Sequence, residues 1–179
     1  MATMRIRKIS SNHNQKGFTL IEILIVVVLL GILATIIIPQ ISISTDDAKL
    51  NTLHNNLTQI RTAIELYYYQ HNNQYPGLVV PGTKPADVTD VAEAFVAQLT
   101  RYTDVDGNIS NSKDATYKYG PYIKGGSLPE NPYNNLSDVT VDTTETDITK
   151  KDSTGAGTGY KFYAITGVFM AADGSHDTL

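Results

Sequence analysis

The most informative ionisable side chain in the sequence is a carboxylate inside an apolar run. Glu22 is the only charged residue between Phe18 and Ile38. A charge inside a membrane helix costs about 2.5 to 3.5 kcal/mol on insertion scales and is retained where it has a partner. In a low-dielectric core, an ion without its partner is left as an expensive buried charge. The sequence therefore predicts that Glu22 meets a cation.

Oxygen-bearing side chains alternate in a second segment, Asp104-Val-Asp106-Gly-Asn108. Calcium loops place oxygen ligands at alternate positions around a glycine. No glutamate follows at the offset that closes the full calcium-loop pattern. We expect a plain Asp-Gly turn at this segment, with a calcium site, the single cofactor that the sequence suggests, as the alternative. The same two interpretations apply to Asp173 and Asp177, which flank a glycine.

The sequence contains none of the common catalytic or cofactor-binding motifs. The four histidines are scattered and include no HExxH motif. The phosphate-binding GxxxxGK[ST], the dinucleotide-binding GxGxxG and the GxSxG nucleophile turn are also absent. The chain has no cysteine, so neither disulfides nor thiolate chemistry are available. These observations predict that the protein is not an enzyme.

The element that must position Glu22 is the apolar run itself. At 1.5 Å per residue, Phe18 to Ile38 forms a helix of about 31 Å, which matches one bilayer crossing. Gly31 and Pro39 weaken its second half, through backbone entropy and a missing amide donor respectively. We therefore predict a transmembrane helix over residues 18–39. Between Gly31 and Pro39 we expect either local melting or a simple proline kink.

The segment that leads into this helix is Lys16-Gly17-Phe18-Thr19-Leu20-Ile21-Glu22. It resembles the class III signal of type IV pilins and type II secretion pseudopilins, in which a basic leader ends in Gly and is followed by Phe and then Glu. The resemblance implies that a prepilin peptidase removes residues 1–17 by cutting between Gly17 and Phe18. The same enzyme then methylates the new Phe18 amine. In a helical filament, this amine can neutralise Glu22 of a neighbouring subunit.

Two other interpretations of the N terminus compete with this one. A cleaved secretory signal has an apolar core of about 7 to 15 residues and a small-x-small cleavage site, whereas this run is longer and ends in Ile-Pro-Gln. An uncleaved anchor would make the chain a single-pass binding module that never polymerises. That interpretation explains neither Glu22 nor the glycine before Phe18.

A second helical pattern follows the apolar run. Its apolar positions recur at spacings of three and four: Leu50, Leu53, Leu57, Ile60, Ile64 and Tyr67. This spacing predicts an amphipathic helix that packs on a globular domain. We expect the amphipathic half of one long helix over residues 40–72 and a globular head over residues 73–179.

The head combines a short helix with β-structure. Asp90-Val-Ala-Glu93 predicts a helix start, and the apolar spacing carries this helix to about Tyr102. From Tyr117 onward, turn residues separate short β-segments, and we expect a long surface loop with weak strands over residues 137–159. The best hairpin joins Tyr160–Ala164 to Val168–Ala171. The predicted fold class is α+β, with a long N-terminal helix spine packed on a small antiparallel sheet, as in pilins.

Charge sets the expected orientation and excludes one class of partner. The first 17 residues carry four of the 14 Lys and Arg and no acid, which places the N terminus in the cytoplasm and the head in the periplasm. The remaining chain has ten basic residues against 18 acids, a net charge of about −8. Nucleic-acid binding depends on clustered Lys and Arg. We therefore expect no nucleic-acid partner.

The later sequence sharpens the resemblance. The C-terminal part of type II secretion G-type proteins is similar to two segments of this chain, GPYIKGGSLPENPYN and GTGYKFYAITGVFMAADG. Many type IVa major pilins have a C-terminal disulfide, which this chain cannot form because it has no cysteine. The resemblance implies a structural subunit of an inner-membrane-anchored, homopolymeric periplasmic fibre. Its implied partners are prepilin peptidase, minor pseudopilins and an inner-membrane assembly platform. The alternative is a type IV pilus subunit, major or minor, in adhesion, motility or DNA uptake.

Overall fold

The structure is a computed structural model that describes residues 17–78, 90–153 and 157–179; the side chains of residues 35–44 are outside this description. The predicted leader therefore lies outside the described residues, except for Gly17. The chain divides into two compact units, Met1–Ser44 and Thr45–Leu179. We refer to the second unit as the head.

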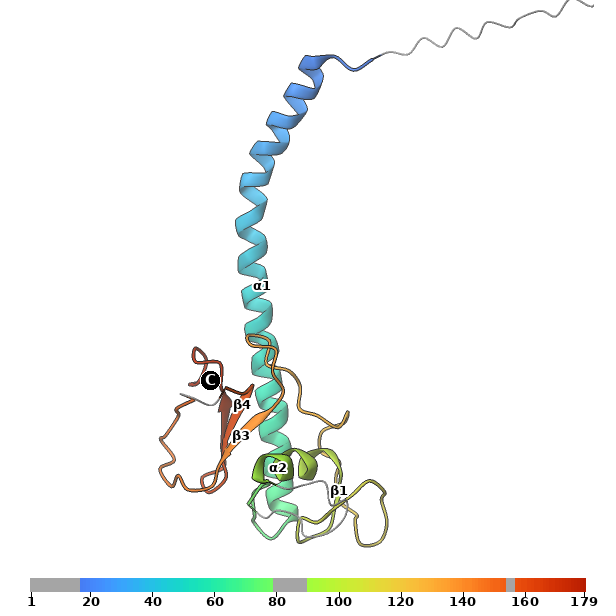
Figure 1. Cartoon of the computed structure of the whole chain (residues 1–179), viewed down its shortest axis with the longest axis vertical. Helices are drawn as coiled ribbons and strands as arrows, with labels where there is room; N and C mark the ends of the chain where they lie inside the picture. Colours follow the sequence, from blue (N-terminus) through green and yellow to red (C-terminus); the bar gives the residue numbers. More distant parts are fainter. Residues whose placement is uncertain (1–16, 79–89, 154–156) are drawn as a thin grey trace, which may run out of the picture. The chain divides into compact units, whose positions relative to one another are not determined.

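The described part contains two helices and five strands (Figure 1). The elements are α1 (Leu20–Gln70), α2 (Val91–Thr100), β1 (Tyr102–Thr103), β2 (Ile109–Ser110), β3 (Val139–Asp142), β4 (Tyr160–Tyr163) and β5 (Val168–Ala171). Strands β1 and β2 form a small antiparallel pair, and the other three form a sheet in the order β3-β4-β5. The predicted combination of a long N-terminal helix with small sheets, an α+β fold, is confirmed.

Helix α1 continues without interruption past Gly31 and Pro39. The local melting expected between these two positions is thus not seen in this single subunit, and it stays a prediction for a subunit packed in a filament. All described side chains from Gly17 to residue 34 are exposed, including Leu20, of which 85% is accessible. Among residues 17–78, 90–153 and 157–179, no helix combines the length and apolar character needed to cross a membrane.

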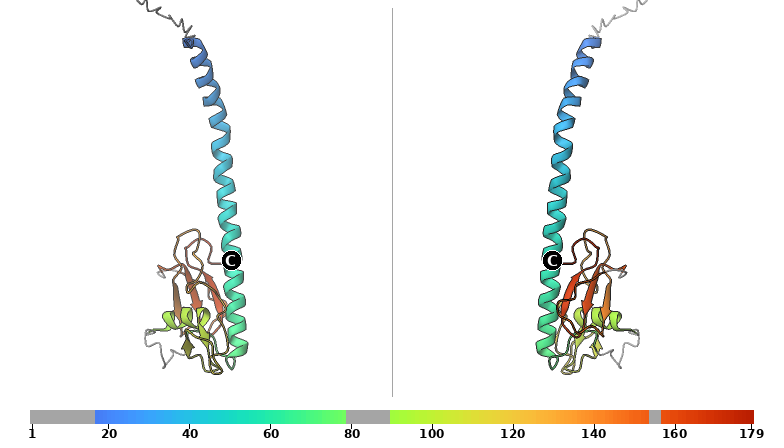
Figure 2. Two further views of the ribbon diagram at one scale, coloured as in Figure 1. Left: turned by 90° about the vertical axis from the view of Figure 1, so that its right-hand side faces the viewer. Right: turned by 90° about the vertical axis from the view of Figure 1, so that its left-hand side faces the viewer.

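Within the head, one face of α1 supplies the core. The predicted apolar positions from Leu53 to Tyr67 are buried, whereas Leu50 is half-buried. They pack in one cluster with side chains of α2 and of the sheet, namely Phe95, Leu99, Tyr160, Phe162 and Phe169. Both views of Figure 2 show the three-stranded sheet lying along this part of α1. The spacing of three and four residues therefore identified the buried face correctly.

Helix α2 starts where the sequence indicated. The Asp90 carboxylate accepts the amides of Ala92 and Glu93, both at 2.8 Å, so the predicted N cap is confirmed. The helix ends at Thr100, two residues before the expected position. The reason is that Tyr102 already pairs with β2 in a hairpin that the sequence analysis did not predict.

The three-stranded sheet is mixed, so the prediction of an antiparallel sheet is wrong in one pairing. The predicted β4–β5 hairpin is present and antiparallel, with Phe162 opposite Phe169. Strand β3 instead pairs in parallel with β4, with Val139 opposite Tyr160. Parallel neighbours need a connection of about a dozen residues or more, and residues 143–159, which belong to the predicted loop with weak strands, provide it. The β-structure expected around residues 117–123 is limited to a bridge between Thr103 and Tyr119.

Candidate functional site

The predicted cleavage point lies in exposed chain before α1. Gly17, Phe18 and Thr19 are outside the helix, and all three are exposed. Phe18 exposes 80% of its side chain. Proteases act on accessible backbone that is not held in regular structure. The Gly17–Phe18 bond therefore has the local environment that a processing site requires.

Thr19 and Glu22 contact each other at the start of α1. Thr19 Oγ1 accepts the Glu22 amide at 3.3 Å, while Glu22 Oε2 accepts the Thr19 amide at 3.4 Å and its hydroxyl at 3.5 Å. This reciprocal arrangement is a capping box. A carboxylate in the first turn also interacts favourably with the positive end of the helix dipole. The sequence analysis missed the role of Thr19, although the Thr-x-x-Glu spacing is its signal.

The cap leaves Glu22 able to bind a further cation. Its contacts with Thr19 are at the long end of the hydrogen-bond range, and the side chain is exposed. Among the described residues, Glu22 Oε1 has no hydrogen-bond partner. Cleavage after Gly17 would create an ammonium group on Phe18, four residues before this carboxylate. Phe18, just before α1, and Glu22, in its first turn, thus carry the two groups that an ion pair between subunits would need.

The structure brings Asp104, Asp106 and Asn108 together in the loop between β1 and β2. Asp104 Oδ1 accepts the amides of Asp106 at 3.0 Å and Asn108 at 2.9 Å, and Oδ2 accepts Asn108 Nδ2 at 2.9 Å. Gly107 completes the turn at a φ of 82°. Both oxygens of Asp104 are therefore already engaged by the loop itself, as in a plain Asp-Gly turn. Calcium binding at this loop stays a prediction, and it would require these hydrogen bonds to open.

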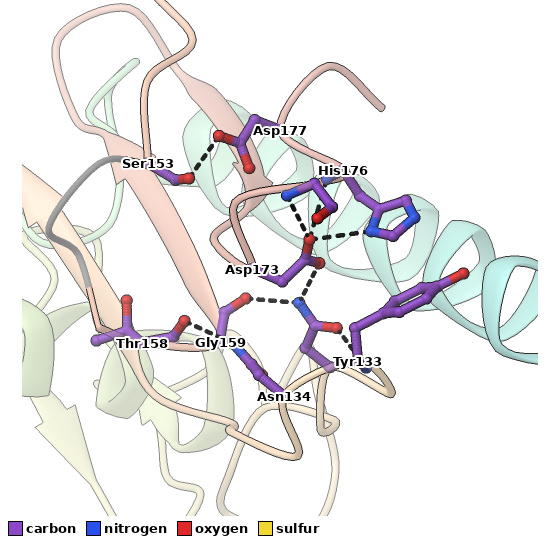
Figure 3. A network of polar contacts seen from close by, with 10 residues as sticks. Tyr133, Asn134, Ser153, Thr158, Gly159, Asp173, His176 and Asp177 are labelled. Atoms are coloured by element: carbon purple, nitrogen blue, oxygen red, sulfur yellow. Dashed lines mark hydrogen bonds and ion pairs between the residues drawn. The ribbon is translucent and has the colours of Figure 1, made fainter.

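Asp173 and Asp177 belong to a polar network near the end of the chain (Figure 3). Asp173 accepts hydrogen bonds from Asn131 Nδ2 at 3.0 Å and from His176 Nδ1 at 2.9 Å. Burial alone would raise the pKa of Asp173, but these hydrogen bonds outweigh it and lower the pKa. Asp177 Oδ2 accepts from Ser153 Oγ at 2.5 Å. In the part of the chain that the structure describes, no group of three or more His, Asp or Glu is placed to hold a metal ion.

His71 is a buried histidine that contacts Thr103, at the end of β1 where the β1–β2 loop begins. His71 Nδ1 lies 2.8 Å from the Tyr67 carbonyl, and Nε2 lies 2.9 Å from Thr103 Oγ1. Because a carbonyl can only accept, Nδ1 carries the proton and Nε2 accepts from the Thr103 hydroxyl. The ring also stacks on Tyr67 with centroids 3.7 Å apart. Burial lowers the pKa of His71, and the nearby Asp104 partly offsets this effect.

A buried glutamine fixes the other side of the same loop. Gln98 Oε1 accepts the Gly77 amide at 2.8 Å, and Gln98 Nε2 donates to the Gly107 carbonyl at 2.9 Å. The side chain thereby joins the segment after α1 to the loop between β1 and β2. Neither His71 nor Gln98 stands in a recognisable sequence pattern, and only the fold reveals their partners.

The chain is similar to a known sequence motif and to several known proteins. The prokaryotic N-terminal methylation motif matches residues 12–38. Type II secretion system core protein G of Pseudomonas aeruginosa is 44% identical over 64 residues, which are 36% of this chain and 44% of that protein. The protein of the same name from Vibrio cholerae serotype O1 is 30% identical over 123 residues, 69% of this chain and 68% of that protein.

A fimbrial protein also matches, over a shorter stretch. Type IV major fimbrial protein FimA of Dichelobacter nodosus is 49% identical over 51 residues, which are 28% of this chain and 33% of that protein. The chain spans 44%, 50% and 64% of the length of the first three core G proteins that it matches. No solved structure matches the chain significantly.

Proposed function

Because the chain belongs to the family of type II secretion system core protein G, we propose that it is a pseudopilin, a structural subunit of a pilus-like periplasmic fibre. The observation that carries this proposal is the methylation motif over residues 12–38, followed by similarity that extends into the head. In this role the chain is a substrate of prepilin peptidase and not itself an enzyme. It contributes shape and adhesion between copies.

The apolar half of α1 holds the subunit in the inner membrane before assembly. The transmembrane role of residues 18–39 is part of this proposal, and two observations support it. The apolar side chains from Phe18 to Leu33 are exposed, with accessible fractions between 48% and 85% among the large ones. An exposed apolar surface of this extent requires lipid or protein around it. The basic leader favours a cytoplasmic N terminus and a periplasmic head.

Assembly then exchanges lipid contacts for contacts between copies. Cleavage after Gly17 exposes the Phe18 amine, and this amine pairs with Glu22 of an adjoining copy inside the bundle of helices. The exposure of Phe18 and Glu22 supports this step, as does Glu22 Oε1, which bonds to none of the described residues. Minor pseudopilins and an inner-membrane assembly platform are the other proposed partners, and a separate ATPase supplies the work. Growth of the fibre pushes folded proteins toward the outer membrane.

The Glu22→Gln substitution tests the ion pair while sparing the cap. Glutamine can occupy the third position of a capping box, so only the charge is lost. Removing one member of a buried ion pair costs about 3 to 5 kcal/mol, so we expect fibre yield to fall at least about tenfold while leader cleavage continues. Electron microscopy of sheared fibres and gel mobility of the cleaved subunit measure the two effects.

The matched control is Glu65→Gln, which changes an exposed glutamate of the same helix within the head. This variant should assemble like the parent chain. A normal fibre yield from Glu22→Gln would show that the charge does not direct assembly.

The match to FimA supports a second candidate, a type IV pilus subunit. The two functions share the N-terminal segment, so gene deletion must distinguish them. Retention of exoproteins in the periplasm after deletion would identify the secretion fibre. Loss of surface adhesion, twitching or DNA uptake with intact secretion would identify a pilus.

Calcium at Asp104, Asp106 and Asn108 remains a separate proposal. The loop contains the oxygen donors that calcium prefers, but both Asp104 oxygens are engaged by hydrogen bonds. A melting temperature that falls on addition of a calcium chelator would support binding. Indifference to the chelator would remove the site.

A further inference from the structure

The head carries a groove that the contacts proposed so far do not use. A cavity of about 440 Å³ lies between α2 and the segments 126–128 and 137–139. Its apolar lining includes Val96, Leu128 and Val139. Cavities of this size can bury small molecules, so an aliphatic side chain with its neighbours fits inside.

Charged residues of both signs line this groove. Glu93 and Asp138 line it as exposed acids, and Arg101 lines it as a base. Glu93 and Arg101 are eight residues apart along α2 and its cap, which corresponds to about 12 Å along the axis. The groove is therefore lined by an acid, Glu93, and a base, Arg101, at separate points along α2.

The loop that follows β3 presents an apolar side chain to solvent. Ile148 is 66% exposed, more than any other large aliphatic side chain described in the head. Local hydrogen bonds shape this loop on both sides of Ile148. The amides of Thr146 and Asp147 both donate to Glu145 Oε1 at 2.9 Å, and the Thr149 amide donates to Asp147 Oδ1 at 2.9 Å. The side chain is thus held outward by an ordered turn.

Ile148 is flanked in the sequence by an acidic and a basic residue, the same two kinds of charge that line the groove. Asp147 precedes it and Lys150 follows it, and both are exposed. Hydrogen bonds from Thr149 lower the pKa of Asp147, which keeps this carboxylate ionised. An acid and a base on the two sides of Ile148 are complementary to a groove that is lined by the base Arg101 and the acid Glu93 at separate points along α2.

The loop and the groove belong to opposite edges of the sheet. The groove lies beside β3, because Ser137 and Val139 line it. The loop reaches the other edge, because Lys151 lines a cavity together with Val168 and Phe169 of β5. Figure 1 likewise draws the loop after β3 and helix α2 on different sides of the head. The contact that the two features fit is therefore one between copies.

We propose that Ile148 of one copy occupies the groove beside α2 of the next copy along the fibre, with Lys150 near Glu93 and with Asp147 near Arg101. The inference rests on the proposed function as a homopolymer. Two different patches of one surface meet in such a contact, which makes it heterologous. A heterologous contact that does not close generates an open helical polymer, which is the kind of assembly that the proposed fibre needs.

Disulfide trapping tests this contact cleanly, because the chain has no cysteine. The test variant combines Ile148→Cys with Ser127→Cys, an exposed position that lines the groove. Mild oxidation of assembled fibres should give a ladder of covalent multimers on a non-reducing gel. The matched control pairs Ser127→Cys with Ile165→Cys, since Ile165 is another exposed isoleucine of the head. The control should give no ladder.

The outcomes separate this inference from the proposed function. Fibres of the test variant that give no ladder, or a ladder equally strong in the control, would overturn the contact and leave the proposed function standing. Failure of the parent chain to form fibres would instead overturn the proposed function and the contact with it. As a second measurement, Ile148→Asp should lower fibre yield several-fold without changing the melting temperature of the subunit, whereas Ile165→Asp should change neither.

Discussion

Glu22 serves the isolated subunit and the proposed polymer in different ways. In the subunit, its carboxylate closes a capping box with Thr19. In the fibre, the same group would neutralise the amine of an adjoining copy. Its charge in an apolar run was sufficient to single it out from the sequence, because such a charge needs a partner. The contribution of Thr19 needed the backbone geometry to be seen.

His71 illustrates what sequence patterns cannot reveal at this scale. A lone histidine has no diagnostic spacing, and its partner Thr103 is 32 residues away along the chain. The calcium prediction at Asp104 rested on alternating oxygen side chains. The structure shows that these side chains bond to one another, an outcome that the same pattern also permits.

The stability of the head should depend on pH through His71. Burial lowers its folded-state pKa below the ordinary value of 6.5, so the unfolded chain takes up a proton first as the pH falls. The stabilisation is therefore complete above about pH 6.5 and is lost below it, by at most about 1.4 kcal/mol per pH unit. Denaturant unfolding of the chain in detergent between pH 5 and 8 measures this slope.

Two variants assign the slope to this side chain. His71→Gln should destabilise the head and abolish its share of the acid-dependent loss. His54→Gln, at an exposed position of the same helix, should leave the loss in place. An unchanged slope in His71→Gln would contradict the assignment.

The helices were easier to predict than strand β3, because their sequence signals lie within a few neighbouring residues. The buried face of α1 and the start of α2 depend on neighbours three or four residues away, and both were found from the sequence. Strand β3 depends on pairing with β4 across a connection of residues 143–159. Its Val-Thr-Val-Asp sequence lies in a stretch rich in Thr and Asp, so local composition indicated a long loop with only weak strands. Non-local pairing decided the outcome.

The turn between β4 and β5 offers a test at the scale of an element. Gly167 has a φ of 76°, and an added Cβ would lie 2.4 Å from the Tyr75 ring. Gly167→Ala therefore combines left-handed backbone strain with a clash, and we expect a loss of about 2 to 4 kcal/mol in the free energy of unfolding. Chemical denaturation measures this loss.

The matched control is Gly174→Ala. Gly174 has a φ of 77°, but nothing lies within 4 Å of an added Cβ. This variant should lose only the strain of about 1 to 2 kcal/mol. Equal losses at both positions would show that the contact between the turn and Tyr75 contributes nothing.

For the whole molecule, the sequence predicted the α+β class and the family but not the contacts of the head. The N-terminal motif is local and specific, so the methylation motif and the core G relatives agree with it. The groove beside α2 and the loop that carries Ile148 lie at opposite edges of the sheet, and this separation follows from the strand order. Surface features of this kind leave no periodic signal in a single sequence, and the structure was needed to relate them.

The proposed function depends as a whole on the maturation of the N terminus. Mass spectrometry of the subunit purified from cells that contain prepilin peptidase tests this point most directly. The expected result is a chain that begins at Phe18 and carries one added methyl group on its amine. A subunit that retains residues 1–17, or that is cut at another bond, would contradict it.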